Sequence, residues 1–426
     1  MIKVDTVTNM IRNWFVGKDQ KFIFEKVDID SFELPDIQET NLYIHIPFCK
    51  SMCPYCPYNR VLYQEEMIGS YITALLEEIE IYARELGRIT ISSVYIGGGT
   101  PTNAIDELED VIDKIKTCFN VVGDIAIETT VADINEYNVQ KLKSYGINMI
   151  SIGVQSFDEK YLELLGRNYN SETIKPALEL LKEANFDTVN IDLMFAFPGQ
   201  SEKEIMDDIN KANEYGIEQI TAYPLFTFPY STIGEYLKIN KIKMPKFFVR
   251  RKFYKLIHDY FIDNGYEMTS VWSFKKKNID GKRYSSVTRE GYIGFGAGAG
   301  SRFKSQFHFN TFGITEYENR LSEGKLPIAV NMPILDRLSR YYWIYWRLYD
   351  TQVSIEEFNK YSDWKMRILM KIFTILGFCK KNEDNYYLNE RGSFWIHLAQ
   401  NYFVLNYINK VWSVMKEESF PERIRI

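Results

Sequence analysis

The sequence predicts an α/β protein: a partial (βα)6 TIM-like barrel followed by a mostly helical, winged-helix-like C-terminal domain. Two observations predict this fold. Between residues 41 and 230, six short β-rich runs alternate with helical stretches, which is typical of parallel βα units that close into a full or partial barrel. Beyond about residue 230 the alternation stops, and residues 335–415 have a helical pattern apart from a hairpin-like run at 378–392.

Each element follows from its local pattern. The six β-runs are NLYIHI, SSVYIG, DIAIET, MISIGV, VNIDLMF and QITAYPL. The stretches between them carry apolar residues at helical spacing over about 65–86, 105–119, 135–145, 171–184 and 202–215. Segment 230–310 mixes a helix, a Lys-rich loop and a Gly-rich run, and we expect it to connect the two parts and cover the substrate.

The length of 426 residues predicts two or three domains. We expect an N-terminal arm at 1–40, the core barrel at 41–230, the connecting and substrate-covering region at 231–330 and the C-terminal helical domain at 331–426. The counts of 51 Lys plus Arg and 57 Asp plus Glu give a net charge of −6, which argues against a nucleic-acid partner. No apolar run reaches the roughly 18 residues of a membrane span, and no signal peptide is visible. We therefore expect a cytoplasmic protein that does not act on membranes.

Three of the five cysteines form one motif, because Cys49, Cys53 and Cys56 fall within eight residues directly after the first β-run. Thiolates are the ligands that iron–sulfur clusters and zinc select. A structural zinc site needs four protein ligands, so the zinc alternative would have to recruit His45. The spacing favours a 4Fe–4S cluster in which one iron keeps an open position. That iron can bind the amino and carboxylate groups of S-adenosylmethionine (SAM), whose reductive cleavage gives a 5′-deoxyadenosyl radical.

Five motifs occur in one order along the chain: YIHIPFC…CPYC, YIGGGTPT, IGVQSFD, LGR and NIDLMFAFPGQ. With these motifs the chain resembles the radical SAM superfamily and, within it, the oxygen-independent coproporphyrinogen III oxidase-like family. The resemblance is close over residues 41–230 and looser through the C-terminal domain. It implies a partial barrel of six βα units, in agreement with the runs counted above.

The resemblance also implies the cofactor-binding residues. Contacts to one SAM molecule are expected from Tyr43, Tyr55, Gly98 and Glu128. A second SAM molecule, as in coproporphyrinogen oxidases, is expected at Gly99, Thr100, Gln155, Arg167 and Asp192. From the sequence pattern, Glu128, Gln155, Arg167 and Asp192 are expected at or just past the ends of successive strands, around the barrel mouth. The glycines of Gly97–Gly99 are expected to let the backbone approach the methionine moiety.

The chain departs from the family at two places. True coproporphyrinogen oxidases carry a fourth cysteine where this chain has Tyr58, as in the haem-chaperone branch, which has an aromatic residue there. The His-Asn-x-x-Tyr-Trp element associated with haem binding in that branch is missing, and residues 284–292 stand in its place. These residues either form a buried turn or bind a polar substrate through Ser285, Ser286, Thr288 and Arg289. His308 is a candidate axial haem ligand, whereas Cys118 and Cys379 are expected to be apolar fillers.

Three functions remain open at this point. The first is a radical SAM oxidoreductase that resembles coproporphyrinogen dehydrogenase and abstracts hydrogen from an organic substrate, a tetrapyrrole being the candidate. The second is a radical methyltransferase or cyclopropanase that uses two SAM molecules. The third is a haem chaperone that houses a cluster without catalysis. A reduced flavodoxin or ferredoxin is the expected electron donor. The aromatic run at 223–230 either lines a substrate pocket or belongs to the core.

Overall fold

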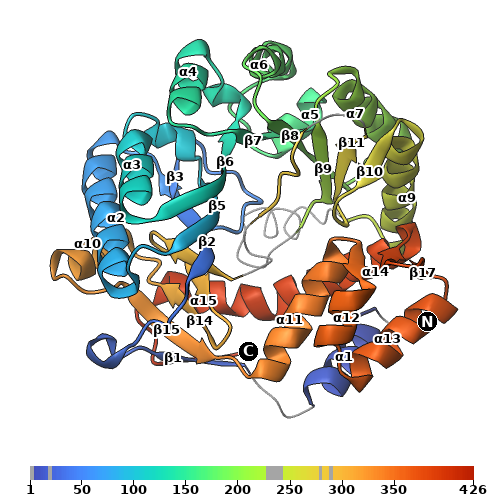
Figure 1. Cartoon of the computed structure of the whole chain (residues 1–426). Coiled ribbons are helices and arrows are strands. Elements are labelled where there is room, and N and C mark those ends of the chain that lie inside the picture. Colours follow the sequence, from blue (N-terminus) through green and yellow to red (C-terminus); the bar gives the residue numbers. More distant parts are fainter. Residues whose placement is uncertain (1–3, 18–21, 227–242, 278–280, 287–290) are drawn as a thin grey trace.

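The computed structural model describes residues 4–17, 22–226, 243–277, 281–286 and 291–426. Its centre is a run of six parallel strands, which pair in chain order. The strands are β2 (Glu39–Ile46), β5 (Thr90–Gly98), β6 (Asn120–Thr130), β7 (Met149–Gln155), β8 (Thr188–Phe195) and β9 (Gln219–Pro224). The helices between them are α2 (Glu65–Leu86), α3 (Leu108–Cys118), α4 (Glu136–Ser144), α6 (Ser171–Glu183) and α7 (Glu202–Glu214). These elements confirm the predicted partial barrel, and the helices lie in an arc outside the strands (Figure 1).

The strand sequences explain why the barrel interior is polar. Along β8, Ile191 and Leu193 are buried, while Asn190 and Asp192 occupy the alternate positions. Alternate residues of a strand face opposite sides, so the apolar set packs on the helices and the polar set faces the interior. Polar caps fix where the helices begin: the side chain of Ser201 accepts a hydrogen bond from Glu204 N, and Glu204 in turn bonds the backbone of Ser201.

The sheet is wider than the six β-runs predicted from the sequence. At the β2 edge, β12 (Tyr292–Phe295) pairs in parallel with β2, so the Gly-rich segment begins as a seventh parallel strand. Antiparallel strands continue from it: β13 (Gly300–Arg302), β14 (Gln306–Asn310), β15 (Ile328–Pro333), β1 (Ile23–Lys26) and β19 (Arg423–Arg425). Gly294 is required there because a Cβ atom at this position would lie 2.1 Å from the carbonyl oxygen of Gly300. At the opposite edge, β11 (Ser273–Lys276) and β10 (Tyr266–Met268) continue from β9.

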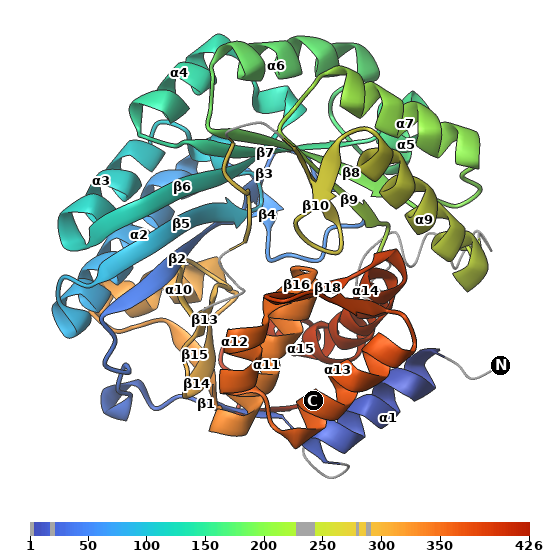
Figure 2. The same ribbon diagram turned by 45° about the vertical axis from the view of Figure 1, so that its right-hand side comes forward.

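The C-terminal region is mostly helical, as predicted, and it lies on the side of the barrel that the arc of helices leaves open (Figure 2). Its helices are α11 (Asp336–Tyr349), α12 (Ile355–Tyr361), α13 (Trp364–Ile375), α14 (Glu390–Phe403) and α15 (Asn409–Glu417). The hairpin-like run forms β17 (Cys379–Lys381) and β18 (Asn385–Leu388), which join β16 (Gln352–Ser354) in a small wing. The N-terminal helix α1 (Val4–Val16) packs on α13, where Trp14 meets Trp364. The division into four parts stays a prediction.

A buried hydrogen-bond network ties the Gly-rich segment to the start of the barrel. The carboxylate of Glu78, on α2, accepts hydrogen bonds from Gly296 N (2.8 Å), Asn310 Nδ2 (2.7 Å) and Tyr317 Oη (2.6 Å). Glu78 is fully buried, and this burial raises its pKa to about 7. The carboxylate therefore holds three segments together with no cation beside it in the described part of the chain.

A second set of bonds continues this network to the cysteine loop, residues 49–58. The ring of His45 bonds Asn59 O through Nε2 (2.8 Å), and the Asn59 amide donates to Ala297 O (3.1 Å) and Phe312 O (3.0 Å). The hydroxyl of Tyr71 donates to His45 O and accepts from Ala297 N. The end of the cysteine loop is thus fixed to the Gly-rich segment.

We predict that Glu78→Ala destabilises the protein by about 3–5 kcal/mol, because each buried donor left without an acceptor costs about 1–3 kcal/mol. Urea denaturation at neutral pH measures this change. The neighbouring Glu77→Ala is the matched control: Glu77 forms an exposed 3.4 Å pair with Arg84, so its loss should cost less than about 0.5 kcal/mol. Equal effects of the two substitutions would contradict the role of Glu78.

Candidate functional site

The three cysteines lie on the loop that follows β2, at the carboxyl end of the barrel strands. Cys49 ends the short strand β3 (Phe48–Cys49), which pairs with β4 (Val61–Leu62), and Cys53 and Cys56 sit in the turn between them. Arg60 Nη2 closes this turn by donating to Cys53 O (2.5 Å) and Cys56 O (3.4 Å). All three cysteines line one cavity of about 360 Å³, which we call the polar cavity.

The cysteines suit a cluster better than a single ion. Among the residues the structure describes, no three His, Cys, Asp or Glu side chains converge closely enough to hold one metal ion. Both ring nitrogens of His45 are already engaged, by Tyr43 and Asn59, so a zinc site completed by His45 is not supported. A 4Fe–4S cluster does not require its ligands to converge on one ion, because each cysteine binds a different iron and the sulfurs surround a larger group. Burial raises the pKa of Cys49 to about 11, so ligand binding must displace a proton from this thiol.

Most of the predicted cofactor-binding residues line the same cavity. They are Tyr55, Gly98, Gly99, Thr100, Glu128, Gln155, Arg167 and Asp192. Tyr43 does not: its hydroxyl is hydrogen-bonded to His45 Nδ1 (2.8 Å), and its ring packs among the residues around Tyr95. Tyr43 therefore does not line the polar cavity, and the SAM contact implied for it stays a prediction.

Glu128 and Asp192 are the two carboxylates that come from barrel strands into this cavity. They lie within β6 and β8 rather than at or past the strand ends, and they reach the cavity because they occupy inward positions. Asp192 accepts hydrogen bonds from Ser151 Oγ (3.0 Å) and Asn190 Nδ2 (2.9 Å). Burial, followed by the nearby charge of Glu128, raises the pKa of Asp192 to about 7, and burial also raises the pKa of Glu128.

Arg167 reaches the cavity by a route that the sequence pattern did not indicate. It was expected at a strand end, but a short helix, α5 (Glu159–Leu164), separates it from β7, so this expectation is wrong. Its guanidinium donates to the hydroxyl of Tyr55 and lies 5.6 Å from the centre of the Tyr55 ring. The pair joins the cysteine loop to the opposite wall of the cavity.

The backbone is strained at one of these residues. Gln155 has a φ of 69°, which only a small fraction of non-glycine residues adopt, and the β7–β8 register shifts beside it. Tyr223 Oη donates to Gln155 Oε1 (2.9 Å) and holds the side chain in place. Strain of this kind is typical of functional sites that the surrounding fold over-determines.

The glycines at the end of β5 and directly after it are needed by the protein's own packing. A Cβ atom on Gly99 would lie 2.7 Å from the carbonyl of Pro47, and one on Gly97 would lie 2.9 Å from Glu128 Oε2. Gly98 has a φ of 119°. The expected close approach to the methionine moiety stays a prediction, because these contacts already require glycine.

Four buried polar atoms of described residues that line the polar cavity have no hydrogen-bond partner. They are Arg167 Nε, Asn103 Oδ1, Thr130 Oγ1 and Tyr284 Oη. Unpaired buried polar atoms are costly, so their gathering around one cavity fits a polar ligand that completes their hydrogen bonds.

The comparisons with known proteins agree with this geometry. A family model described as the radical SAM superfamily matches residues 43–212. The chain is 28% identical over 290 residues to the haem chaperone HemW of Bacillus subtilis, covering 67% of this chain and 76% of HemW. It is 24% identical over 387 residues to the anaerobilin synthase of Escherichia coli O157:H7, covering 88% and 84% of the two chains. The solved coproporphyrinogen III oxidase (HemN) of Escherichia coli has the same fold, with a TM-score of 0.72 at 20% identity over 90% of this chain and 95% of that one.

Residues 43–212 form a radical SAM superfamily domain. The chain as a whole is similar to the coproporphyrinogen III oxidase-like family that includes HemN and HemW. The radical SAM domain implies a 4Fe–4S cluster and SAM as cofactors, and the unpaired polar atoms of the polar cavity fit a ligand as polar as SAM. No helix in the described ranges has the length and apolar character that crossing a bilayer requires.

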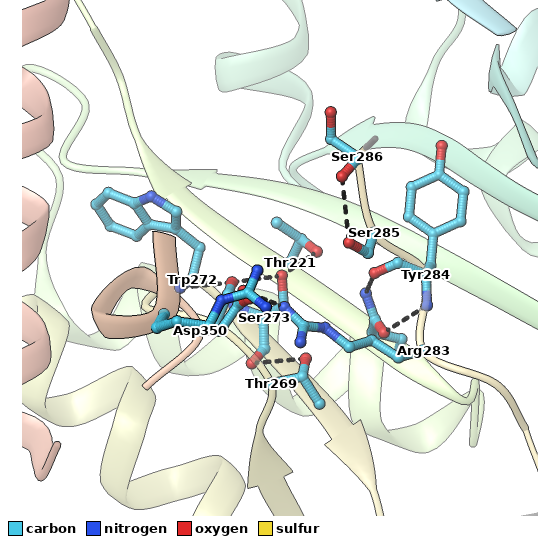
Figure 3. Close-up of polar contacts among 12 residues, drawn as sticks. Thr221, Thr269, Trp272, Ser273, Arg283, Tyr284, Ser285, Ser286 and Asp350 are labelled. Carbon is cyan, nitrogen blue, oxygen red and sulfur yellow. Dashed lines mark hydrogen bonds and ion pairs between the residues drawn. The ribbon is translucent and has the colours of Figure 1, made fainter. Parts of the chain in front are cut away.

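The segment that begins at Tyr284, in the region expected to correspond to the haem-binding element of the haem-chaperone branch, also reaches the polar cavity. Ser285 and Ser286 line the cavity, and Tyr284 exchanges two hydrogen bonds with the side chain of Gln219 (3.1 and 3.0 Å). Figure 3 shows the three residues following one another along the segment, with Ser285 Oγ donating to Ser286 O (3.3 Å). Thr288 and Arg289 lie outside the described residues, as does the part of the aromatic run from Thr227 on.

The inward polar residues of the middle strands are part of the site that the sequence reasoning missed. Asn190 donates to Ser151, and it accepts from Gln219 (3.2 Å) and Thr221 (2.8 Å). Ser151, Asn190 and Thr221 line the polar cavity. Their signal in the sequence is a polar residue at every second position of an otherwise apolar β-run.

The remaining histidines and cysteines lie elsewhere. His308 is fully buried and bonded to Tyr82 (3.2 Å), and burial lowers its pKa to about 3, so an axial haem contact is not supported there. His397 is buried against Trp272, with ring centres 4.0 Å apart, and His258 pairs with Asp259. Cys118 and Cys379 are free thiols outside the polar cavity.

We predict that stability falls as pH rises through about 7 because of Asp192. Its folded pKa is raised from the ordinary value of 3.8, so its stabilising contribution is complete below about pH 4 and is lost as pH rises through about 7. One such group changes the free energy of unfolding by at most about 1.4 kcal/mol per pH unit. Asp192→Asn should remove the contribution of Asp192 to this slope, because an amide does not titrate. The fold should be kept, since the amide can still bond Ser151 and Asn190.

Urea denaturation of the metal-free protein between about pH 5 and pH 8 measures the slope. The same substitution at the exposed Asp207 of α7 is the control and should leave the slope as it is in the native protein. An Asp192→Asn protein with the native slope would show that another group titrates.

Proposed function

We propose that this protein is a radical SAM enzyme that abstracts a hydrogen atom from an organic substrate. Cys49, Cys53 and Cys56 hold the 4Fe–4S cluster, and SAM lies in the polar cavity. The observation that carries the proposal is that these cysteines share one cavity with the Glu128–Asp192 carboxylates and with Arg167. When bound, the cluster and SAM supply a 5′-deoxyadenosyl radical.

The chain's own residues divide the binding tasks. Glu128 and Asp192 are placed to accept hydrogen bonds from ribose hydroxyls, while Arg167 offers a guanidinium for a carboxylate. The ring of Tyr55, one residue before Cys56, lies beside Arg167 and provides an apolar face for the adenine. We propose that a second SAM molecule uses Gly99, Thr100, Gln155, Arg167 and Asp192, with Glu128 and Tyr55 serving the first.

Two reactions fit these residues. An oxidation resembling that of coproporphyrinogen III oxidase uses the radical to remove hydrogen, and radical methyl transfer or cyclopropanation uses a second SAM as the carbon donor. The residues around Asp192 serve either chemistry, so methyl transfer is kept as the alternative. A non-catalytic haem carrier is the least supported, because His308 is buried and bonded to Tyr82 away from the polar cavity. A reduced flavodoxin or ferredoxin is the proposed electron donor.

One assay distinguishes these functions. The cluster is reconstituted anaerobically, and reductant, SAM and coproporphyrinogen III are added before the products are identified by mass spectrometry. Protoporphyrinogen supports the oxidase, and S-adenosylhomocysteine together with 5′-deoxyadenosine supports methyl transfer. An intact cluster that yields no 5′-deoxyadenosine, with or without the substrate, overturns both enzymatic proposals.

We expect Cys53→Ala to lose the cluster, because two thiolates cannot hold it. Iron content per chain and the visible absorption band measure the loss. Cys118→Ala, which removes a thiol outside the polar cavity, should keep both at the native level. A native spectrum in Cys53→Ala would remove Cys53 from the ligand set.

We expect Arg167→Ala to weaken SAM binding about tenfold to a hundredfold, because a hydrogen bond to a charged group contributes about 1.5–3 kcal/mol. Calorimetric titration of SAM into the reconstituted protein gives the affinity. Arg340→Ala, at an exposed ion pair on α11, is the control. Unchanged affinity in Arg167→Ala would separate this residue from the cofactor.

A further inference from the structure

A second cavity lies beside the polar cavity, between the barrel and the C-terminal helices. We call it the apolar cavity; its volume is about 380 Å³. The cysteine loop contributes Pro57 and Tyr58, the barrel side contributes Met194 and Trp272, and α14–α15 contribute the facing wall. Tyr55, Tyr58 and Tyr223 line both cavities, so the two share a wall next to the cysteines.

The facing wall has a specific construction. Gln400, Val404, Ile408 and Trp412 line the apolar cavity at intervals of four residues. An α-helix turns about 100° per residue, so positions four apart drift by about 40° at each step and soon leave one face. Between α14 and α15, however, Val404–Ile408 is a π-helical turn. Its i→i+5 hydrogen bonds give a smaller rotation per residue, and this cancels part of the drift. The π-turn therefore keeps the four side chains on one face, and such turns are frequent at functional sites.

The described lining of this cavity carries no charged side chain and no histidine. Its polar groups mostly bond one another or residues behind the wall. Trp272 Nε1 donates to Gln400 Oε1 (3.0 Å), and Thr221 Oγ1 donates to Asn190 Oδ1 (2.8 Å). Arg283, drawn in Figure 3, is ion-paired with Asp350.

Two polar groups in the described lining keep free hydrogen-bonding capacity. The hydroxyl of Tyr58 and the amide nitrogen of Gln400 make no hydrogen bond to any described residue. Tyr58 stands where coproporphyrinogen oxidases are expected to carry the fourth cysteine, and 52% of it is exposed. The apolar cavity thus offers a large aromatic and aliphatic surface with one polar group on each of two walls.

We infer that the apolar cavity binds the substrate, and that the substrate is an uncharged, mostly apolar, flat molecule with a single polar group. Flatness follows from the aromatic walls that Trp272, Trp412 and Tyr58 provide, since rings pack best on planar partners. The shared wall places such a molecule next to the polar cavity. The identification of this ligand as the substrate rests on the proposed radical function, whereas its binding does not.

A tetracarboxylate such as coproporphyrinogen does not fit this lining. A buried carboxylate without a cation or full set of donors is strongly disfavoured, and the described walls offer no cation. The substrate of this chain therefore differs from that of its oxidase relatives in carrying no charge.

Nile red, a flat uncharged dye whose fluorescence rises in apolar surroundings, is the probe. We expect it to bind the metal-free protein and to quench Trp272 and Trp412 by energy transfer. Ile408→Glu, which puts a charge into the cavity wall, should weaken binding at least tenfold, whereas the isosteric Ile408→Leu should retain it. Coproporphyrin III at tenfold excess over the dye should not displace it.

The matched control is Ile372→Glu on α13, where the isoleucine is 43% exposed and lies outside the cavity. It should change dye affinity less than twofold. If Ile408→Glu does not fold, as judged by its thermal transition, Tyr58→Glu at the exposed edge of the cavity replaces it with the same expected loss. Native affinity in a folded charge variant, a loss in Ile372→Glu equal to that in Ile408→Glu, or efficient displacement by coproporphyrin III overturns the inference.

The 5′-deoxyadenosine assay keeps the two proposals separate. Protein that forms 5′-deoxyadenosine but binds Nile red equally well with and without a charge in the cavity overturns the substrate site alone. Protein that shows the expected dye binding but forms no 5′-deoxyadenosine with an intact cluster overturns the radical function and leaves the apolar binding site standing.

Discussion

The buried attachment of the cysteine loop is the constraint on which the site depends. Three thiols on one turn would be mobile on their own, but the loop is anchored at its start by β3–β4 pairing and at its end by Asn59. Asn59 is bonded to the Gly-rich segment, which Glu78 in turn fixes to α2. The positions of the cysteines therefore depend on residues almost 240 positions away in the sequence. The Gly-rich segment contributes none of the three cysteines, but it helps to hold them in position.

The barrel contributes a second, simpler constraint, which is the alternation of side chains along its strands. One set of alternate residues packs on the helices, and this leaves the other set free to be polar. Ser151, Asn190 and Asp192 are linked by hydrogen bonds across two neighbouring strands, so each orients the next. A polar interior of this kind costs stability unless every group finds a partner, and the unpaired atoms that remain mark where a ligand is needed.

Sequence reasoning predicted the barrel well because each βα unit carries its own local signal. It missed β12 because a strand of Tyr, Ile, Gly and Phe has no alternation, and its place beside β2 depends on contacts far away in the chain. The cysteine motif and Asp192 could be found from order and spacing. The position of Arg167 could not, because the six-residue helix α5 is too short to leave a periodic pattern. Tyr43 illustrates the opposite case: its motif is intact, but its hydroxyl is already bonded to His45.

The π-turn at Val404–Ile408 also bears on how such proteins diverge. A π-turn is an α-helix with one residue too many, so the loss of a single codon there would restore the regular helix. Positions eleven apart in an α-helix lie on nearly the same face, so Trp412 would still face the cavity and the change would fall on the stretch of wall between Gln400 and Trp412. The cysteine loop and the barrel strands would be left intact by that change. A family can in this way alter the shape of a ligand chamber in one genetic step while its radical-generating machinery stays the same.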